Sequence, residues 1–331
     1  VVEQLPDGCR QVQFGHVPHS YRGLARNFSS ATQYIAFSTE GINGLSVPLQ
    51  KWVREQLLPA KLTQKPRPVH YNCWEAIYFD HHVELLQDLA QRAAGLGAER
   101  FVLDDGWFGQ RDDDTSSLGD WDLDVRKYPQ GLTPLIDHVQ SLGMGFGLWF
   151  EPETVNEDSE LYRTHPDWVL GKATQSQGRQ QLVLNIALTE VQNYLYKKVS
   201  NLLNNNAIEY IKWDHNRVLP FADAAQTHAI YALLSRLRSA FPNVEIESCS
   251  SGGGRIDYGI LQHTQRVWLS DSNDALERLR IQHQAAIFLP AIVTGSHVGR
   301  RYCHTSARVH SMAFRAWGSS AATHGNGNGP A

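Results

Sequence analysis

The chain has 331 residues, of which 30 are Lys or Arg and 34 are Asp or Glu, so its formal net charge is −4. This balance excludes a protein that binds nucleic acid by neutralising phosphates, and it lacks the basic excess of a helix on a membrane surface. No apolar run approaches the roughly 18 residues of a membrane span, and 42% hydrophobic residues indicate a globular chain.

Residues 1–68 mix Gly, Pro and Ser with short alternating runs, and apolar residues at helical spacing predict a helix over 49–57. The segment ends in Lys65-Pro66-Arg67-Pro68, whose prolines predict an extended linker. No signal peptide is visible in it, and because the first residue is Val rather than Met, we expect a processed chain or a fragment. We therefore predict a unit separate from the chain that follows.

Between residues 69 and 300, short apolar or β-branched runs alternate with amphipathic stretches. The amphipathic spacing predicts helices over 82–97, 189–203 and 224–241. The runs predict eight strands, at 69–76, 100–107, 144–151, 181–186, 208–214, 244–249, 266–271 and 291–298. Alternating strands and helices form parallel sheets, so eight units predict a (β/α)8 TIM barrel. An open doubly wound sheet is the alternative, but its Gly-rich fingerprint is missing after the first strand.

The four cysteines are far apart and match neither a disulfide framework nor a zinc finger. They are Cys9, Cys73, Cys249 and Cys303. Unpaired thiols are typical of a reducing compartment, so we predict a cytoplasmic protein. No pair of His residues has metal-ligand spacing at a strand end, so we predict neither a metal nor a cofactor.

The carboxyl ends of the predicted strands, where a barrel of this class builds its active site, are dense in carboxylates and tryptophans. They carry Trp74, Glu75, Asp104, Asp105, Trp149, Glu151, Asn185, Lys212, Asp214, Cys249, Asp271 and His297. One such Asp is usually a helix N-cap, but caps do not explain so many ends at once. Paired carboxylic acids perform nucleophilic and acid/base chemistry on sugars, and Trp faces stack against sugar rings.

Six blocks of this region resemble glycoside hydrolase family 36, the α-galactosidases. They are 71-YNCWEAIYFD-80, 103-LDDGWFGQRDDDTSSLGDW-121, 147-GLWFEPETVNEDSELYRTHPDWVL-170, 210-YIKWDHNR-217, 247-ESCSSGGGRID-257 and 268-WLSDSNDALERLRIQ-282. Within the family the chain looks most like the bacterial enzymes that act on raffinose and melibiose. The resemblance implies a retaining double displacement through a covalent galactosyl-Asp intermediate.

Under this resemblance, Asp214 of the KWD motif matches the nucleophile and Asp271 of the WxSD motif matches the general acid/base. Asp274 is the rival for the second role, but its position fits the N-cap of the next helix. Lys212 lies two residues before Asp214, on the same side of the strand, where its charge would keep Asp214 ionised.

The resemblance also implies a set of galactose-binding residues. Asp104 and Asp105 match a pair that accepts from the sugar hydroxyls, whereas Asp120 and Trp121 are expected near the entrance or the leaving-group subsite. For Cys249 the ordinary reading is a buried structural thiol. The full substrate-binding set is Trp74, Asp104, Asp105, Trp149, Arg179, Lys212, Asn216, Cys249 and Gly252.

Three domain limits follow from the resemblance: the trailing edge of a β-sandwich domain plus linker at 1–68, the catalytic barrel at 69–315, and a disordered or non-native tail at 316–331. Because the sequence leaves the family pattern near Ala316, we expect a catalytic-domain fragment that lacks the last barrel helix. We expect a small-molecule galactoside as partner, and a homo-oligomer in the full-length form. The alternatives are a galactosyl transferase, an α-N-acetylgalactosaminidase and an inactive fragment that binds galactosides.

Overall fold

The computed structural model describes residues 2–12, 31–58, 66–171, 175–221, 223–272 and 274–299. Cys303, the predicted tail at 316–331 and the end of the eighth strand–helix unit lie outside these ranges. The first described segment is an antiparallel hairpin of β1 (Val2–Gln4) and β2 (Arg10–Val12). Whether residues 1–68 belong to a β-sandwich domain stays a prediction.

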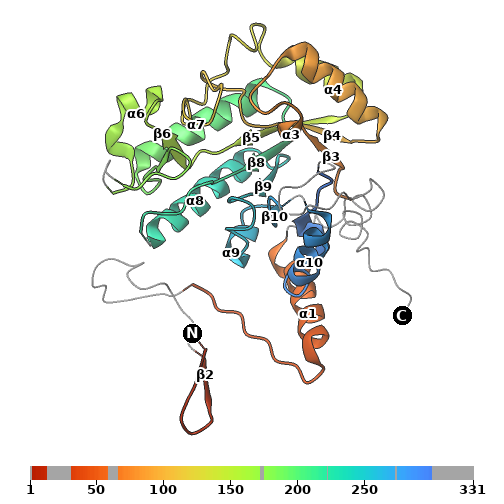
Figure 1. Ribbon diagram of the computed structural model, residues 1–331, viewed down its shortest axis with the longest axis vertical. Helices are drawn as coiled ribbons and strands as arrows, with labels where there is room; N and C mark the ends of the chain where they lie inside the picture. The colour runs from red at the N-terminus through yellow and green to blue at the C-terminus, as the bar shows by residue number, and fades with distance from the viewer. Residues whose placement is uncertain are drawn as a thin grey trace.

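The helix predicted over 49–57 is the second part of a longer element. Helix α1 (Gly41–Trp52) runs directly into one π-helical turn, Val53–Leu57. The Ser46 hydroxyl donates to the carbonyl of Ala286 at 2.9 Å, which fixes α1 beside the end of α10 (Ala275–Ala285), as Figure 1 shows. The N-terminal segment is therefore tied to the last described helix.

A curled parallel sheet forms the centre of the molecule (Figure 1). Its strands follow one another in chain order, whereas a doubly wound sheet reverses its order at a switch point. The order therefore excludes the alternative fold and confirms the barrel-type arrangement. The strands are β3 (His70–Asn72), β4 (Arg100–Leu103), β5 (Gly145–Phe150), β8 (Tyr210–Trp213), β9 (Glu245–Ser248), β10 (Arg266–Trp268) and β11 (Thr294–Gly295).

The strand predicted at 181–186 is not part of this sheet, so the expectation of eight parallel strands is wrong for the described residues. β7 (Gln181–Val183) instead pairs antiparallel with β6 (Thr154–Asn156), and β5 pairs directly with β8. Leu182 and Val183 are fully buried, as in a central strand. An apolar run shows that a strand is covered, but it does not show with which strand it pairs.

The three predicted helices are confirmed as α4 (Val83–Gly95), α7 (Thr189–Asn205) and α8 (Ala224–Ala240). Their apolar spacing buries one stripe of each helix, for example Leu86, Ala90 and Ala93 of α4. The other helices are α3 (Trp74–Ile77), α5 (Thr133–Ser141), α6 (Glu160–Thr164), α9 (Tyr258–Leu261) and α10, with 3₁₀ turns at Pro166–Trp168 and Ala291–Val293. None in the described ranges is long and apolar enough to cross a membrane.

Ion pairs fill the amino end of the sheet. Arg100 binds Glu245 at 3.0 Å, and Arg266 binds Glu247 at 2.7 Å. We call this group the basal cluster, and it comprises Arg67, His70, Arg100, Glu209, Glu245, Glu247 and Arg266. Burial, together with the three neighbouring arginines, holds the pKa of His70 well below its usual value. Basic and acidic groups therefore neutralise one another at this end of the sheet. The predicted catalytic residues lie at the opposite end.

Candidate active site

The site is assembled at the carboxyl ends of the parallel strands, because those ends meet at one edge of the sheet. Asp104 follows β4, Trp149 lies in β5, and Asp214 follows β8. Cys249 follows β9, and Asp271 lies three residues beyond β10. Elements far apart in sequence thus bring the predicted catalytic and binding residues to one place.

Asp214 is 6% exposed and is held by uncharged donors. Its Oδ1 accepts from the backbone N–H of His215 at 2.8 Å. Its Oδ2 accepts from Asn216 Nδ2 at 2.8 Å and from Trp149 Nε1 at 3.3 Å. These contacts fix the direction of the carboxylate without neutralising it.

The charge of Asp214 depends on its surroundings. Burial alone would raise its pKa, but the Lys212 ammonium and hydrogen bonds from Cys249, Asn216 and the His215 backbone outweigh burial and hold the pKa below its usual value. An ionised and oriented carboxylate is the form that a nucleophile requires.

Lys212 connects two carboxylates of the site. Its Nζ lies 3.7 Å from Asp104 Oδ2. Burial would lower the pKa of Lys212, but the charges on Asp104 and Asp214 raise it well above the usual value, so the ammonium persists. Asp104 also accepts from Asn72 Nδ2 at 2.5 Å and is 4% exposed.

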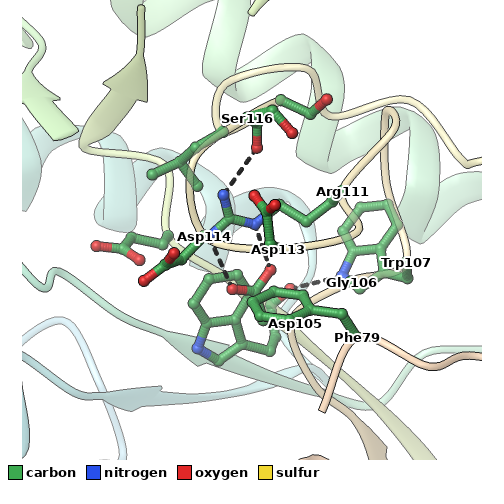
Figure 2. A network of polar contacts seen from close by, with 12 residues as sticks. Phe79, Asp105, Gly106, Trp107, Arg111, Asp113, Asp114 and Ser116 are labelled. Carbon is green, nitrogen blue, oxygen red and sulfur yellow. Dashed lines mark hydrogen bonds and ion pairs between the residues drawn. The ribbon is translucent and has the colours of Figure 1, made fainter. Parts of the chain in front are cut away.

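Asp105 has a different environment from its neighbour Asp104. Arg111 donates to both oxygens of Asp105, through Nε at 2.8 Å and a terminal nitrogen at 2.9 Å (Figure 2). Arg111 is fully buried and also donates to the Ser116 carbonyl and to Asn156 Oδ1. Asp105 therefore anchors the loop that follows β4, and each of its oxygens is already bonded before any sugar arrives.

Asp271 is exposed, and its Oδ1 accepts from Trp268 Nε1 at 2.8 Å. Gly252 packs against its backbone: a Cβ there would lie 2.7 Å from the Asp271 nitrogen, and the φ of +80° also demands glycine. Asp274 accepts from the N–H groups of Leu276 and Glu277, which confirms it as the N-cap of α10.

Arg179 lies on a strained turn. Arg179 and Gln180 have φ values of +52° and +57°, and the Gln181 N–H closes the turn on the Gly178 carbonyl at 3.0 Å. Two consecutive non-glycine residues in the left-handed region are costly and are typical of functional loops. Trp74 is half-buried at the start of α3, with its ring edge-on to nearby aromatic rings.

The expected entrance role is wrong for Trp121, and for Asp120 it stays a prediction. Trp121 is 1% exposed and lies inside the core, where its ring centroid is 4.4 Å from that of Phe108. Asp120 accepts from the N–H groups of Glu160 and Leu161, at the start of α6. An aromatic and an acid beside a motif therefore serve to pack the core and cap a helix.

Glu151 is among the strand-end residues named from the sequence, but the family motifs assign it no role. Glu151 is 1% exposed and accepts from the backbone and the side chain of Asn216. Both hydrogens of the Asn216 amide are thereby engaged, one by Glu151 and one by Asp214. Its position at the end of β5 was the available signal.

No group of three His, Cys, Asp or Glu residues suits a metal ion in the part of the chain that the structure describes.

A family model described as Melibiase matches residues 27–326. The α-galactosidase of Escherichia coli is 50% identical over 325 residues, which cover 95% of this chain and 46% of that protein. The crystal structure of the GH36 α-galactosidase AgaA from Geobacillus stearothermophilus matches with a TM-score of 0.82 and 40% identity, covering 86% of this chain and 42% of AgaA. A variant of AgaA has been solved in complex with raffinose. The chain spans about half the length of the curated relatives it matches.

Proposed function

This chain belongs to the melibiase family and to its GH36 α-galactosidases, and from that premise we propose that it hydrolyses terminal α-galactosides with retention of configuration. The observation that carries the proposal is that Asp214, buried and held ionised by Lys212, and the exposed Asp271 both lie at the carboxyl end of the sheet, after β8 and β10, with only β9 between these two strands. Melibiose and raffinose-type oligosaccharides are the proposed substrates, because a variant of the related AgaA has been solved with raffinose bound.

In the first step, Asp214 attacks the anomeric carbon while the bond to the leaving oxygen breaks and Asp271 gives that oxygen its proton. In the second step, Asp271 takes a proton from water, and the resulting hydroxide displaces Asp214 from the sugar. Trp149 and Asn216 hold Asp214 throughout, because they donate to the same oxygen.

The galactose ring is proposed to lie between these two carboxylates. Asp104 and Lys212 are close enough together to bind neighbouring hydroxyls as acceptor and donor. The other proposed sugar contacts come from Trp74, Asp105, Trp149, Arg179, Asn216, Cys249 and Gly252. The same premise supports the domain limits 1–68, 69–315 and 316–331, a homo-oligomeric full-length protein, and a cytoplasmic location in keeping with the free thiols of Cys9, Cys73 and Cys249.

Hydrolysis of p-nitrophenyl α-galactoside by the chain and by Asp214→Gly, with and without azide, tests the proposal. We expect the wild-type chain to be active and Asp214→Gly to be inactive. Azide should restore turnover in the variant and yield the β-galactosyl azide, because it enters the space of the lost carboxylate. An α-galactosyl azide would contradict the assigned nucleophile, and a folded but inactive wild-type chain would contradict the activity.

A further inference from the structure

Glu151 is a buried carboxylate whose described donors are all neutral amides. Its Oε1 accepts from the Asn216 backbone N–H at 2.7 Å, and its Oε2 accepts from Asn216 Nδ2 at 2.9 Å. Gln181 Nε2 donates to the same Oε2 at 3.3 Å. A buried carboxylate normally has a cationic partner, as Glu245 and Glu247 of the basal cluster do, so this arrangement needs an explanation.

Asn216 links Glu151 to the proposed nucleophile. The amide nitrogen of Asn216 has two hydrogens, and it directs one to Asp214 Oδ2 at 2.8 Å and the other to Glu151 Oε2. Its Oδ1 accepts from the Ser251 hydroxyl at 3.3 Å. Turning this amide over would point its oxygen at two carboxylates, so the two acids together fix its orientation.

We propose that Glu151 is a positioning residue for Asp214: it holds Asn216 in the orientation from which the amide donates to Asp214, and this shared donor links the proton on Glu151 to the charge on Asp214. The inference rests on the proposed function, because it assigns Asp214 the role of nucleophile. Glu151 itself touches no reacting atom and acts through Asn216.

The charged groups that act on Glu151 support this link. Burial, followed by the negative charge on Asp214, raises the pKa of Glu151 to about 7, against the hydrogen bonds from Asn216 and the charge of Arg179. The charge of Glu151 in turn raises the pKa of Arg111, in the loop after β4. The ionised form accepts from the amides described above. The protonated form has an acceptor in Gln181 Oε1, which lacks a hydrogen-bond partner and would face Glu151 after a turn of the amide.

The link has a consequence for the reaction. When the bond between Asp214 and the anomeric carbon forms, the negative charge on Asp214 disappears, while the proton of Asp271 goes to the leaving oxygen. Repulsion no longer favours a proton on Glu151, so this proton passes to bulk water. Hydrolysis of the intermediate restores the charge on Asp214, and Glu151 takes a proton back. Asp214→Asn reproduces the uncharged state without any sugar.

Infrared titration tests the link without turnover. In the wild-type chain we expect a band of a protonated carboxyl group that disappears with a midpoint near pH 7. Glu151→Gln should lack this band. Asp214→Asn should lower its midpoint by about one pH unit or more, because a neighbouring charge is removed. Asp271→Asn is the matched control, since it removes a charge from the same site without contact to Asn216. An unchanged midpoint in Asp214→Asn would overturn the proposal.

Kinetics test the positioning role in the active chain. Glu151→Gln places an amide hydrogen against the donors of Asn216, so we expect kcat to fall at least about tenfold with KM little changed. The inflection near pH 7 in kcat/KM should disappear. Glu157→Gln, at an exposed acid in the same loop, should retain both. Wild-type kinetics in Glu151→Gln would reject the role. An inactive wild-type chain would instead reject the proposed function, and the infrared titration would still decide on Glu151.

Discussion

Two pairs of buried carboxylates, one pair at each end of the central sheet, have different hydrogen-bond partners. At the amino end, Arg67 and Arg100 bind Glu245 at 2.7 and 3.0 Å, and Arg266 binds Glu247. At the carboxyl end, Asp214 and Glu151 accept hydrogen bonds from neutral amide, indole and backbone N–H groups. Lys212, whose charge lowers the pKa of Asp214, forms its ion pair with Asp104 instead.

This difference separates stability from reactivity. An arginine bound to a carboxylate through hydrogen bonds fixes both groups and occupies the oxygens. A carboxylate held by neutral donors keeps its negative charge available for a bond to carbon. Asp105 refines the comparison, because it stands at the carboxyl end but is bound by Arg111 in the manner of the basal cluster. Pairing, rather than position alone, distinguishes an anchor from a reactive group.

The largest expected effect tests the carboxyl end. Asp214→Asn keeps the shape and the size of the side chain but removes its charge. We expect kcat for p-nitrophenyl α-galactoside to fall by about 10³-fold or more, because the proposed nucleophile is lost. Thermal unfolding followed by circular dichroism should remain one cooperative transition. Activity within tenfold of the wild type would remove the contrast between the two ends.

The next effect tests the amino end. Glu247→Gln leaves Arg266 buried without its counter-charge, so we expect a loss of about 3–5 kcal/mol in the free energy of unfolding. The side chains of the pair are 3% and 10% exposed. Urea denaturation measures this loss. The control is Glu160→Gln, which breaks an exposed pair with Arg163 and should cost far less stability, because solvent screens that pair. Equal losses in the two variants would show that burial does not set the value of these pairs.

Much of the fold depends on local patterns and can therefore be predicted from the sequence. Apolar spacing predicts α4, α7 and α8, because a helix buries one stripe wherever it packs. The N-cap Asp274 is predicted by its distance from the strand end and by the helical pattern that follows. The barrel-type fold follows from alternating strand and helix patterns and the family from the motif blocks, and both are confirmed by the matched family model and the GH36 structure.

Contacts between loops that are distant in the chain could not be predicted from the sequence. The pairing of β7 with β6 depends on where the loop after β5 folds back. Asp105 and Asp104 are adjacent residues of the same type. They are distinguished by the loop after β4, which folds back so that Arg111 binds Asp105. Glu151 and Asn216 are far apart in the chain, so their double hydrogen bond has no local pattern. Such contacts depend on tertiary geometry rather than on residue type.

A smaller effect compares the two ends through pH. The pKa of Glu151 is raised from 4.5 to about 7, so its contribution to stability is present below pH 4.5 and is lost as the pH rises through 7. Burial would raise the pKa of Glu245 too, but its arginines hold it below 4.5, so its contribution is present above pH 4.5 and is lost as the pH falls. Relative to the wild type, Glu151→Gln should be more stable at pH 8 by up to about 3 kcal/mol, and Glu245→Gln less stable. Urea unfolding at pH 5 and pH 8 measures both, and parallel pH curves would contradict the contrast.

The smallest expected effect concerns the turn that carries Arg179. Arg179 and Gln180 both occupy the left-handed region, which glycine adopts without steric cost. Gln180→Gly should therefore raise the free energy of unfolding by about 0.5–1 kcal/mol and leave KM unchanged. Arg179→Gly should give the same gain but raise KM, because it also removes the proposed sugar contact. Urea unfolding and steady-state kinetics on the two variants separate strain from binding. If both raise KM equally, the shape of the turn rather than the guanidinium serves the substrate, and if neither gains stability, the turn stores no strain.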